Sequence, residues 1–168
     1  MVNFLHNITA LAGAATLVNI IDFKDQRINL NGASGWTVGT PVISFADTPG
    51  APNQDWTIVP QTDGTTFTIQ SFAQPALFVS YASVVAGAGV IHHSQTMASD
   101  ASKAIVFKMQ TVGSGPQVQL IDSATGLVLT SWVNADAATY TDSTTPVTME
   151  GNNTKAPTFM QSFTITGI

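Results

Sequence analysis

A chain of 168 residues is long enough to form one domain with its own hydrophobic core. It contains no cysteine, which excludes disulfides and thiolate metal sites, and only 9% of its residues are charged. The net charge of −5, with only five lysines and arginines, argues against nucleic acid and anionic membranes as partners, because both attract basic proteins.

The N-terminal segment, residues 1–15, is mostly apolar. No Lys or Arg precedes Lys24, so the charged region that opens a secretory signal peptide is missing. Polar residues such as Asn3, His6 and Asn7 make the segment unsuited to spanning a membrane, and we expect no membrane insertion. We expect residues 1–15 to form an arm that packs on the domain.

The rest of the chain consists of short β-rich runs separated by clusters of Gly, Pro, Asn, Asp and Ser, with almost no helical periodicity. This pattern is typical of all-β sandwiches and barrels. The pattern predicts twelve strands: Thr16–Asp22, Arg27–Asn31, Pro41–Ala46, Asp55–Pro60, Thr66–Phe72, Leu77–Ala82, Val90–Ser94, Ala104–Gln110, Gln117–Asp122, Leu127–Val133, Pro146–Glu150 and Gln161–Thr166.

Corresponding segments recur at intervals near 50 residues. The intervals Asp22–Ile28, Phe72–Phe78 and Asp122–Val128 each span six residues. Three four-strand units that close around an axis bury their apolar faces together and leave few open edges. We therefore predict an all-β fold, a β-trefoil: one domain of residues 1–168 with repeats at about 16–61, 66–110 and 117–168. The alternative is a β-sandwich with coincidental spacing.

The predicted core takes one inward-facing side chain from each strand. Its members are Leu17, Ile28, Val42, Trp56, Ile69, Phe78, Val90, Ile105, Leu120, Val128, Val147 and Phe163, with Leu30, Ile58, Phe107 and Ile165 beside them. Trp56 is the largest of these residues, and its indole N–H needs an acceptor when it is buried.

The first repeat contains three motifs in a recognisable order. Arg27-Ile-Asn-Leu-Asn-Gly32 is followed by Gly39-Thr-Pro-Val-Ile-Ser-Phe45 and then by Asn53-Gln-Asp-Trp56. This order resembles a repeat of the ricin B-type (R-type) β-trefoil lectins, whose fourth strand carries a Gln-x-Trp motif. The match is close in the first repeat only, because repeat three retains Gln161-Ser-Phe163 and repeat two has Lys103-Ala-Ile105.

The resemblance implies a carbohydrate site in the first repeat. In the family, an acidic residue on strand two, an aromatic platform and an Asn before the Gln-x-Trp motif bind one sugar. The corresponding residues here are Asn29, Phe45, Asn53 and Gln54. Asn29 departs from the pattern, because an amide makes weaker hydrogen bonds than a carboxylate. Asp25 and Asp47 are candidates to compensate for the missing acid.

The other two repeats are expected to have empty or altered sites. Val79 and Leu129 occupy their acidic positions, and His93 and Glu150 are aligned with the platform. Structural roles compete with binding roles even in the first repeat. Phe45 is also consistent with the end of an apolar strand, and an Asn-Gln pair is also consistent with a turn cap.

Loop aromatic residues define a second function class. Trp36, Trp132 and Tyr140 lie in or beside polar loops, where they would either contact a protein partner or fold back on the barrel. Fungal trefoils without cysteine, the mycocypins, resemble this chain in size and inhibit proteases, and accessory subunits of secreted enzymes belong to the same class. The two resemblances together imply a fungal source.

The expected partner is therefore a glycan or glycoprotein, or alternatively another protein. The three histidines, His6, His92 and His93, have no metal-ligand spacing, and no nucleophile elbow or phosphate loop is present. We therefore expect a protein that is not an enzyme and needs no cofactor.

Overall fold

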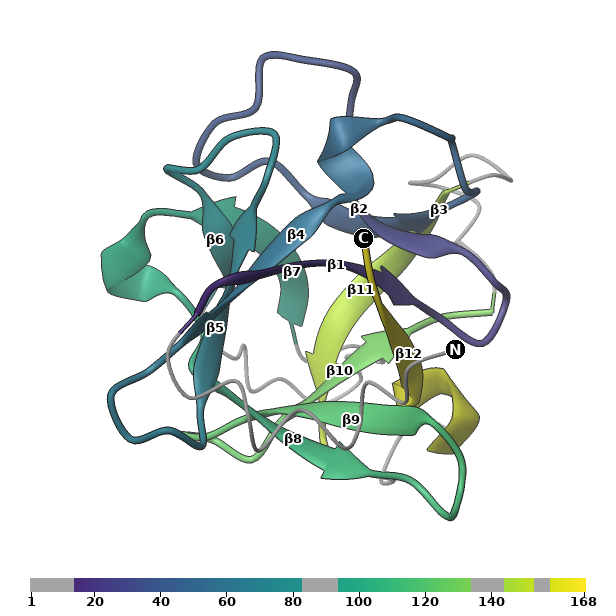
Figure 1. Ribbon diagram of the computed structural model, residues 1–168. Coiled ribbons are helices and arrows are strands. Elements are labelled where there is room, and N and C mark those ends of the chain that lie inside the picture. Colours follow the sequence, from purple (N-terminus) through teal and green to yellow (C-terminus); the bar gives the residue numbers. More distant parts are fainter. Residues whose placement is uncertain (1–13, 83–93, 134–143, 153–157) are drawn as a thin grey trace.

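The computed structural model describes residues 14–82, 94–133, 144–152 and 158–168. It contains twelve strands and short 3-10 turns (Figure 1). Repeat one has β1 (Thr16–Ile21), β2 (Arg27–Leu30), β3 (Val42–Phe45), η2 (Pro52–Gln54) and β4 (Trp56–Pro60). Repeat two has β5 (Phe67–Ser71), β6 (Phe78–Tyr81), β7 (Ser94–Ser99), η3 (Ala101–Lys103) and β8 (Phe107–Thr111). Repeat three has β9 (Gln117–Asp122), β10 (Val128–Ser131), β11 (Thr144–Glu150), η4 (Thr158–Gln161) and β12 (Phe163–Gly167).

Six strands close into a barrel, to which each repeat contributes its first and fourth strand. β1 pairs with β4, β4 with β5, β5 with β8, β8 with β9, β9 with β12 and β12 with β1, all antiparallel. A closed ring has no free sheet edge. No helix in the described part of the chain is long and apolar enough to cross a bilayer.

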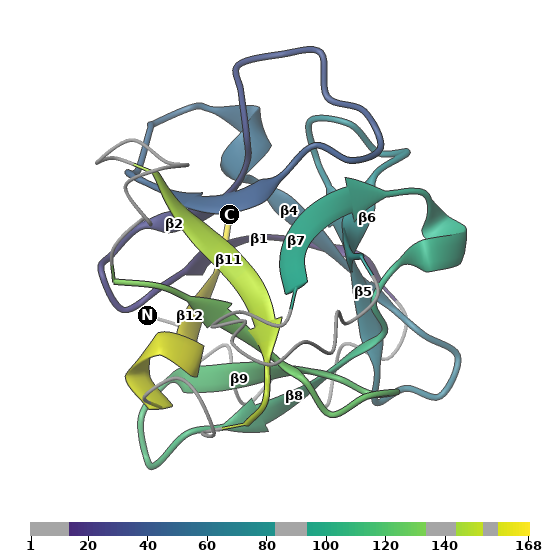
Figure 2. The same cartoon turned by 180° about the vertical axis from the view of Figure 1, so that it is seen from behind.

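The remaining six strands form three hairpins that cap the barrel. β2 pairs with β3, β6 with β7 and β10 with β11. β11 also pairs with β3 and with β7, which joins the three hairpins (Figure 2). This arrangement is a β-trefoil, as the sequence predicts.

The core lies inside the barrel and under the hairpins. Trp56, Phe107 and Phe163 are its largest fully buried side chains, and Trp56 Nε1 donates to the backbone oxygen of Ile28 at 2.8 Å. Two predicted core residues are wrong, because Leu17 and Phe78 are only half-buried. Their strands bury the adjacent residues instead, since a shift of one position exchanges the two faces of a strand. These adjacent buried residues are Val18, Leu77 and Val79.

The third strand of repeat two is also displaced from its predicted place. The sequence favours Val90–Ser94 because it begins with two β-branched apolar residues, but β7 is the polar segment Ser94–Ser99. Pairing with β6 on one side and β11 on the other holds this segment, which overrides its weak strand propensity. Predictions for residues 1–13, Val90 and Tyr140 lie outside the described residues.

Candidate functional site

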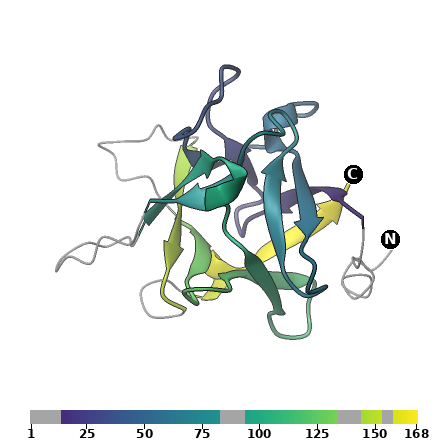
Figure 3. The same ribbon diagram turned by 90° about the vertical axis from the view of Figure 1, so that its left-hand side faces the viewer.

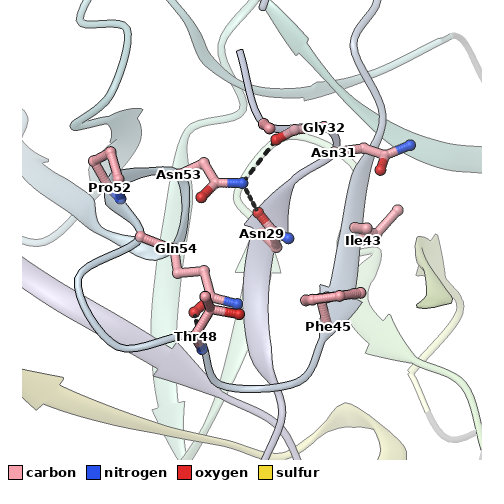
Figure 4. A pocket seen from close by; sticks show the side chains of 11 residues that line it. Asn29, Asn31, Gly32, Ile43, Phe45, Thr48, Pro52, Asn53 and Gln54 are labelled. Atoms are coloured by element: carbon pink, nitrogen blue, oxygen red, sulfur yellow. Dashed lines mark hydrogen bonds between the residues drawn. The ribbon is translucent and has the colours of Figure 1, made fainter. Parts of the chain in front are cut away.

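A pocket of about 490 Å³ opens on repeat one, between β2, β3 and η2 (Figure 4). The β2–β3 loop and η2, which border it, project from the same end of the molecule (Figure 3). All four predicted carbohydrate residues line it. The complete lining is Asn29, Asn31, Gly32, Ala33, Ile43, Phe45, Thr48, Ala51, Pro52, Asn53 and Gln54.

Asn53 and Asn29 form an amide pair in this pocket. Asn53 Nδ2 lies 2.6 Å from Asn29 Oδ1 and 3.0 Å from the backbone oxygens of Leu30 and Gly32. Figure 4 shows the amide of Asn53 facing Asn29 and Gly32. Because these bonds use the nitrogen of Asn53 and the oxygen of Asn29, the pair retains one acceptor, Asn53 Oδ1, and one donor, Asn29 Nδ2.

Gln54 has a different role, although it follows Asn53 directly. Its side chain is fully buried, and Nε2 donates to the oxygen of Ala46 at 2.8 Å. Its Oε1 accepts from the N–H of Thr48, also at 2.8 Å. Both amide atoms are therefore bound to the loop of residues 46–51, which forms one wall of the pocket. Gln54 shapes the site by holding this loop in place.

Phe45 is the aromatic residue of the pocket. It is half-buried at the end of β3, opposite Arg27 of β2. Side chains alternate along a strand, so Ile43 and Phe45 lie on the same face as Asn29, which is opposite Ile43 in the register. Figure 4 shows the Phe45 ring next to Ile43, across the pocket from Gln54 and Thr48. The pocket thus combines one aromatic ring with a neutral amide pair.

Among the residues that the structure describes, no carboxylate or cation lines the pocket. Asp47 is bound to Arg27, with 3.0 Å between its Oδ2 and Arg27 Nη2, and Asp25 occupies a tight turn with φ of 59°. Neither aspartate replaces the acid that Asn29 lacks. Within the described ranges, no group of three His, Cys, Asp or Glu side chains is placed to hold a metal ion.

Several lining residues escaped the sequence interpretation. Asn31 and Ile43 could have been found from strand alternation, because Asn31 lies two positions beyond Asn29 and Ile43 lies opposite it. Thr48, Ala51 and Pro52 belong to the loop that Gln54 holds. No local sequence signal indicates that this loop folds back over the strands.

Repeat two lacks the loop that walls this pocket. Its strand register places Ser99 opposite Phe78, as Phe45 lies opposite Arg27 in repeat one, so Ser99 stands at the platform position. Only Asp100 then separates β7 from η3, whereas residues 46–51 separate β3 from η2. The alignment of His93 with the platform is therefore wrong, and His93 itself lies outside the described residues.

Repeat three also has a different arrangement. Glu150 is fully buried, pairs with Val128 across β10 and β11, and accepts a hydrogen bond from Thr148 Oγ1 at 2.6 Å. Glu150 therefore stands at the position of Phe45, where the sequence alignment places it, but it is a buried carboxylate and provides no aromatic platform. Gln161 retains the role of Gln54, because its Nε2 donates to the oxygen of Gly151 at 3.1 Å.

The two described loop tryptophans are both half-buried. Trp36 packs against the core, and its Nε1 donates to the oxygen of Gly32 at 3.1 Å. Trp132 Nε1 donates to Thr148 Oγ1 at 2.8 Å. Of these two tryptophans, Trp36 bonds to a residue that lines the repeat-one pocket, namely Gly32. Tyr140, the third predicted partner contact, lies outside the described residues.

Comparison with solved structures gives β-trefoils over most of the chain. A designed three-fold symmetric protein, ThreeFoil, aligns with a TM-score of 0.68 at 13% identity, covering 90% of this chain and 99% of its own. The Rhizoctonia solani agglutinin aligns with a TM-score of 0.67 at 17% identity, and the alignment covers 92% of this chain and 96% of the agglutinin. The Macrolepiota procera ricin B-like lectin, solved in complex with lactose, aligns with a TM-score of 0.64 at 16% identity. This alignment covers 90% of this chain and 95% of the lectin.

At these identities the structural likeness establishes the fold alone. No protein-family model matches the sequence, and no curated protein matches it. The chain therefore has a lectin-like β-trefoil fold, which it shares with ricin B-like lectins.

Proposed function

We propose that the protein is a non-catalytic carbohydrate-binding trefoil with an intact sugar site of the lectin type in repeat one. The observation that carries this proposal is the Phe45 ring beside the Asn29–Asn53 amide pair in one pocket. A sugar ring has apolar C–H faces that pack on aromatic rings, and its hydroxyls both donate and accept hydrogen bonds. A glycan or glycoprotein is the corresponding partner.

The available hydrogen-bonding atoms suit two neighbouring hydroxyls. One hydroxyl donates to Asn53 Oδ1, and the next accepts from Asn29 Nδ2, while the sugar packs on Phe45. No charged group takes part, so each hydrogen bond is of the weaker, neutral type. The solved complex of the Macrolepiota procera lectin with lactose supports the sugar assignment by analogy of fold.

A glycan array followed by calorimetric titration of each hit tests the proposal. Binding of at least one glycan with a stoichiometry of one at the repeat-one pocket is expected. Asn29→Asp replaces the Nδ2 donor by a carboxylate oxygen, to which the same sugar hydroxyl can donate instead. We expect tighter binding, because a hydrogen bond to a charged acceptor is roughly twice as strong as a neutral one. Absence of binding to every glycan, in a protein that is folded by circular dichroism, would contradict the proposal.

A protein-binding function is the second candidate. The β2–β3 loop carries Trp36 and the strongly exposed Val38, of which 58% is accessible. Apolar side chains on a loop are suited to a protein contact. Inhibition assays against papain-like and trypsin-like proteases test this candidate, and Val38→Asp should abolish any inhibition. If wild type inhibits neither class, the protease-inhibitor form of this candidate is wrong.

A further inference from the structure

A second cavity, of about 460 Å³, lies at the junction of repeats two and three. Three segments wall it: the end of β6 with Ser80 and Tyr81, the connection 103–106 between η3 and β8, and the turn 122–125 between β9 and β10. None of these residues lines the repeat-one pocket. We call this cavity the seam cavity.

A buried carboxylate organises the polar wall of the seam cavity. Asp122 is only 5% exposed, and its Oδ2 accepts from the hydroxyls of Tyr81 and Thr125, both at 2.7 Å. Its Oδ1 accepts from the N–H of Ala124 at 2.9 Å. Burial opposes ionisation, but these hydrogen bonds outweigh it and lower the pKa of Asp122, while burial raises the pKa of Tyr81. At neutral pH the carboxylate is therefore charged and the phenol is protonated.

This arrangement leaves hydrogen-bonding capacity on Tyr81. The Tyr81 oxygen lies 3.3 Å from Thr125 Oγ1, and both hydroxyls lie 2.7 Å from Asp122 Oδ2. With both protons directed at the carboxylate, the Tyr81 oxygen keeps lone pairs that can accept from an external donor. The ring of Tyr81 is half-buried and lines the cavity. Ser80 offers less, because its hydroxyl already donates to the oxygen of Lys103 at 2.6 Å.

The junction of repeats three and one contains the equivalent contact, Ser131 to Asp22, and there both residues are buried. Ser131, the last residue of β10 as Tyr81 is of β6, donates to Asp22 Oδ2 at 2.6 Å. Ser44 donates to the same oxygen at 2.6 Å, and Lys24 Nζ lies 3.4 Å from it. Ser131 is fully buried, so the chain satisfies this carboxylate without an external ligand. The seam cavity has a tyrosine where this junction has a serine, and it remains accessible.

We propose that the seam cavity is a second saccharide site, in which a sugar hydroxyl donates to the Tyr81 oxygen and the sugar packs against the Tyr81 ring. This rests on the proposed carbohydrate-binding function. A neutral ligand fits better than a cation, because Lys103 lines the same cavity and offsets the charge of Asp122. With two sites in different repeats, one molecule would join two glycan chains.

Tyrosine labelling gives a direct test, because the chain contains only two tyrosines. With ¹³C-labelled tyrosine rings, Tyr81→Phe assigns the Tyr81 signal in the NMR spectrum. Wild type is then titrated with galactose, lactose, glucose, mannose and N-acetylglucosamine, and separately with choline. A saturable shift of the Tyr81 signal with at least one saccharide is expected, and it should persist in Phe45→Ala, which removes the repeat-one platform.

The outcomes separate this proposal from the proposed function. If saccharides are bound at repeat one but the Tyr81 signal never moves, the seam proposal is overturned and the proposed function stands. If the Tyr81 signal moves while Phe45→Ala changes no affinity, the seam site stands and the repeat-one site is overturned. A shift with choline alone shows a cation site and overturns the saccharide assignment.

The hydroxyl of Tyr81 is tested by its own removal. In Tyr81→Phe, affinity read from the backbone amide signal of Ser123, a lining residue, should fall roughly threefold to tenfold, the usual effect of one neutral hydrogen bond. Thr57→Val, which removes a hydroxyl on β4 outside the seam cavity, should leave this affinity unchanged. Equal affinity in Tyr81→Phe and wild type would overturn the hydrogen bond to Tyr81.

Discussion

At the residue scale, the run Asn53 to Trp56 assigns adjacent side chains to different tasks. Asn53 faces the pocket and pairs with Asn29, Gln54 holds the 46–51 loop, and Trp56 fills the core under Ile28. The change from η2 to β4 within this run turns successive side chains in different directions. A motif of four residues therefore joins the site to the core.

The role of Gln54 can be separated from direct ligand contact. Gln54→Ala leaves the Thr48 N–H and the Ala46 oxygen without their partner, so the free energy of unfolding should fall by about 1–3 kcal/mol. Glycan affinity should fall with it, because the loop loses its anchor. Gln161→Ala, the matched change in repeat three, should destabilise to a similar extent but leave glycan affinity at repeat one unchanged. Urea denaturation and calorimetric titration measure both effects.

Asp122 should make stability depend on pH in the acid range. Its pKa in the folded protein lies below the ordinary value of 3.8, so its stabilisation is fully present above that value and is lost as the pH falls through the folded pKa. Urea midpoints of wild type and Asp122→Asn, measured across this range, should converge as the pH decreases. A constant difference between them would contradict this assignment.

At the element scale, the loop between β3 and η2 distinguishes repeat one from repeat two. Residues 46–51 form this loop in repeat one, and Asp100 alone stands at the same place in repeat two. Both repeats nevertheless supply equivalent strands to the trefoil. The loop is therefore needed for the pocket and not for the fold.

Shortening this loop tests that division. Replacing residues 46–51 by a single aspartate, as in repeat two, should keep the β-sheet circular dichroism spectrum and a cooperative thermal transition. Glycan binding at repeat one should be lost, because Thr48 and Ala51 no longer wall the pocket. Retained binding would show that these residues do not contribute to the site.

The sequence predicts the strands better than their faces. The spacing near 50 residues gives the trefoil, because three units with one apolar face each have few other ways to bury it. The sequence places Leu17 and Phe78 on the wrong face, because the adjacent apolar residues Val18 and Leu77 fit the predicted strands equally well in the opposite phase. The sequence does not predict β7, because this strand is stabilised by pairing with β6 and β11 and not by the strand propensity of its own residues.

The two candidate sites also differ in how far the sequence predicts them. Asn29, Phe45 and Asn53 were found through motif order, since strand register brings them together directly. The Tyr81–Asp122 contact joins two repeats and was missed, although the equal intervals from Asp22 to Ile28 and from Asp122 to Val128 already marked Asp122.

At the scale of the whole molecule, stability comes from a closed barrel with an apolar core and few charges. The described residues contain two ion pairs, Lys24–Asp22 and Arg27–Asp47. The Asp22 side chain is fully buried, which protects the first pair from screening, and the second is partly exposed. Ionic strength therefore acts mainly on one pair of modest value.

Thermal denaturation in sodium chloride tests this account of the charges. An exposed ion pair contributes about 0.2–1 kcal/mol, so the Tm should change by less than about 3 °C between low and high salt. Arg27→Ala should remove most of whatever salt dependence is seen. A much larger shift in wild type would reveal a charged cluster among the residues outside the described ranges.

The central claim is that repeat one binds a sugar on the Phe45 ring. The most direct measurement is a calorimetric titration of wild type, Phe45→Ala and Phe45→Trp with the best ligand from the glycan array, with circular dichroism of each variant. We predict that Phe45→Ala stays folded and loses at least tenfold in affinity at this site, about 1.4 kcal/mol, while Phe45→Trp keeps or increases the affinity. Unchanged affinity in a folded Phe45→Ala, or unfolding of that variant, would contradict the claim, because the ring would then be no platform or part of the core.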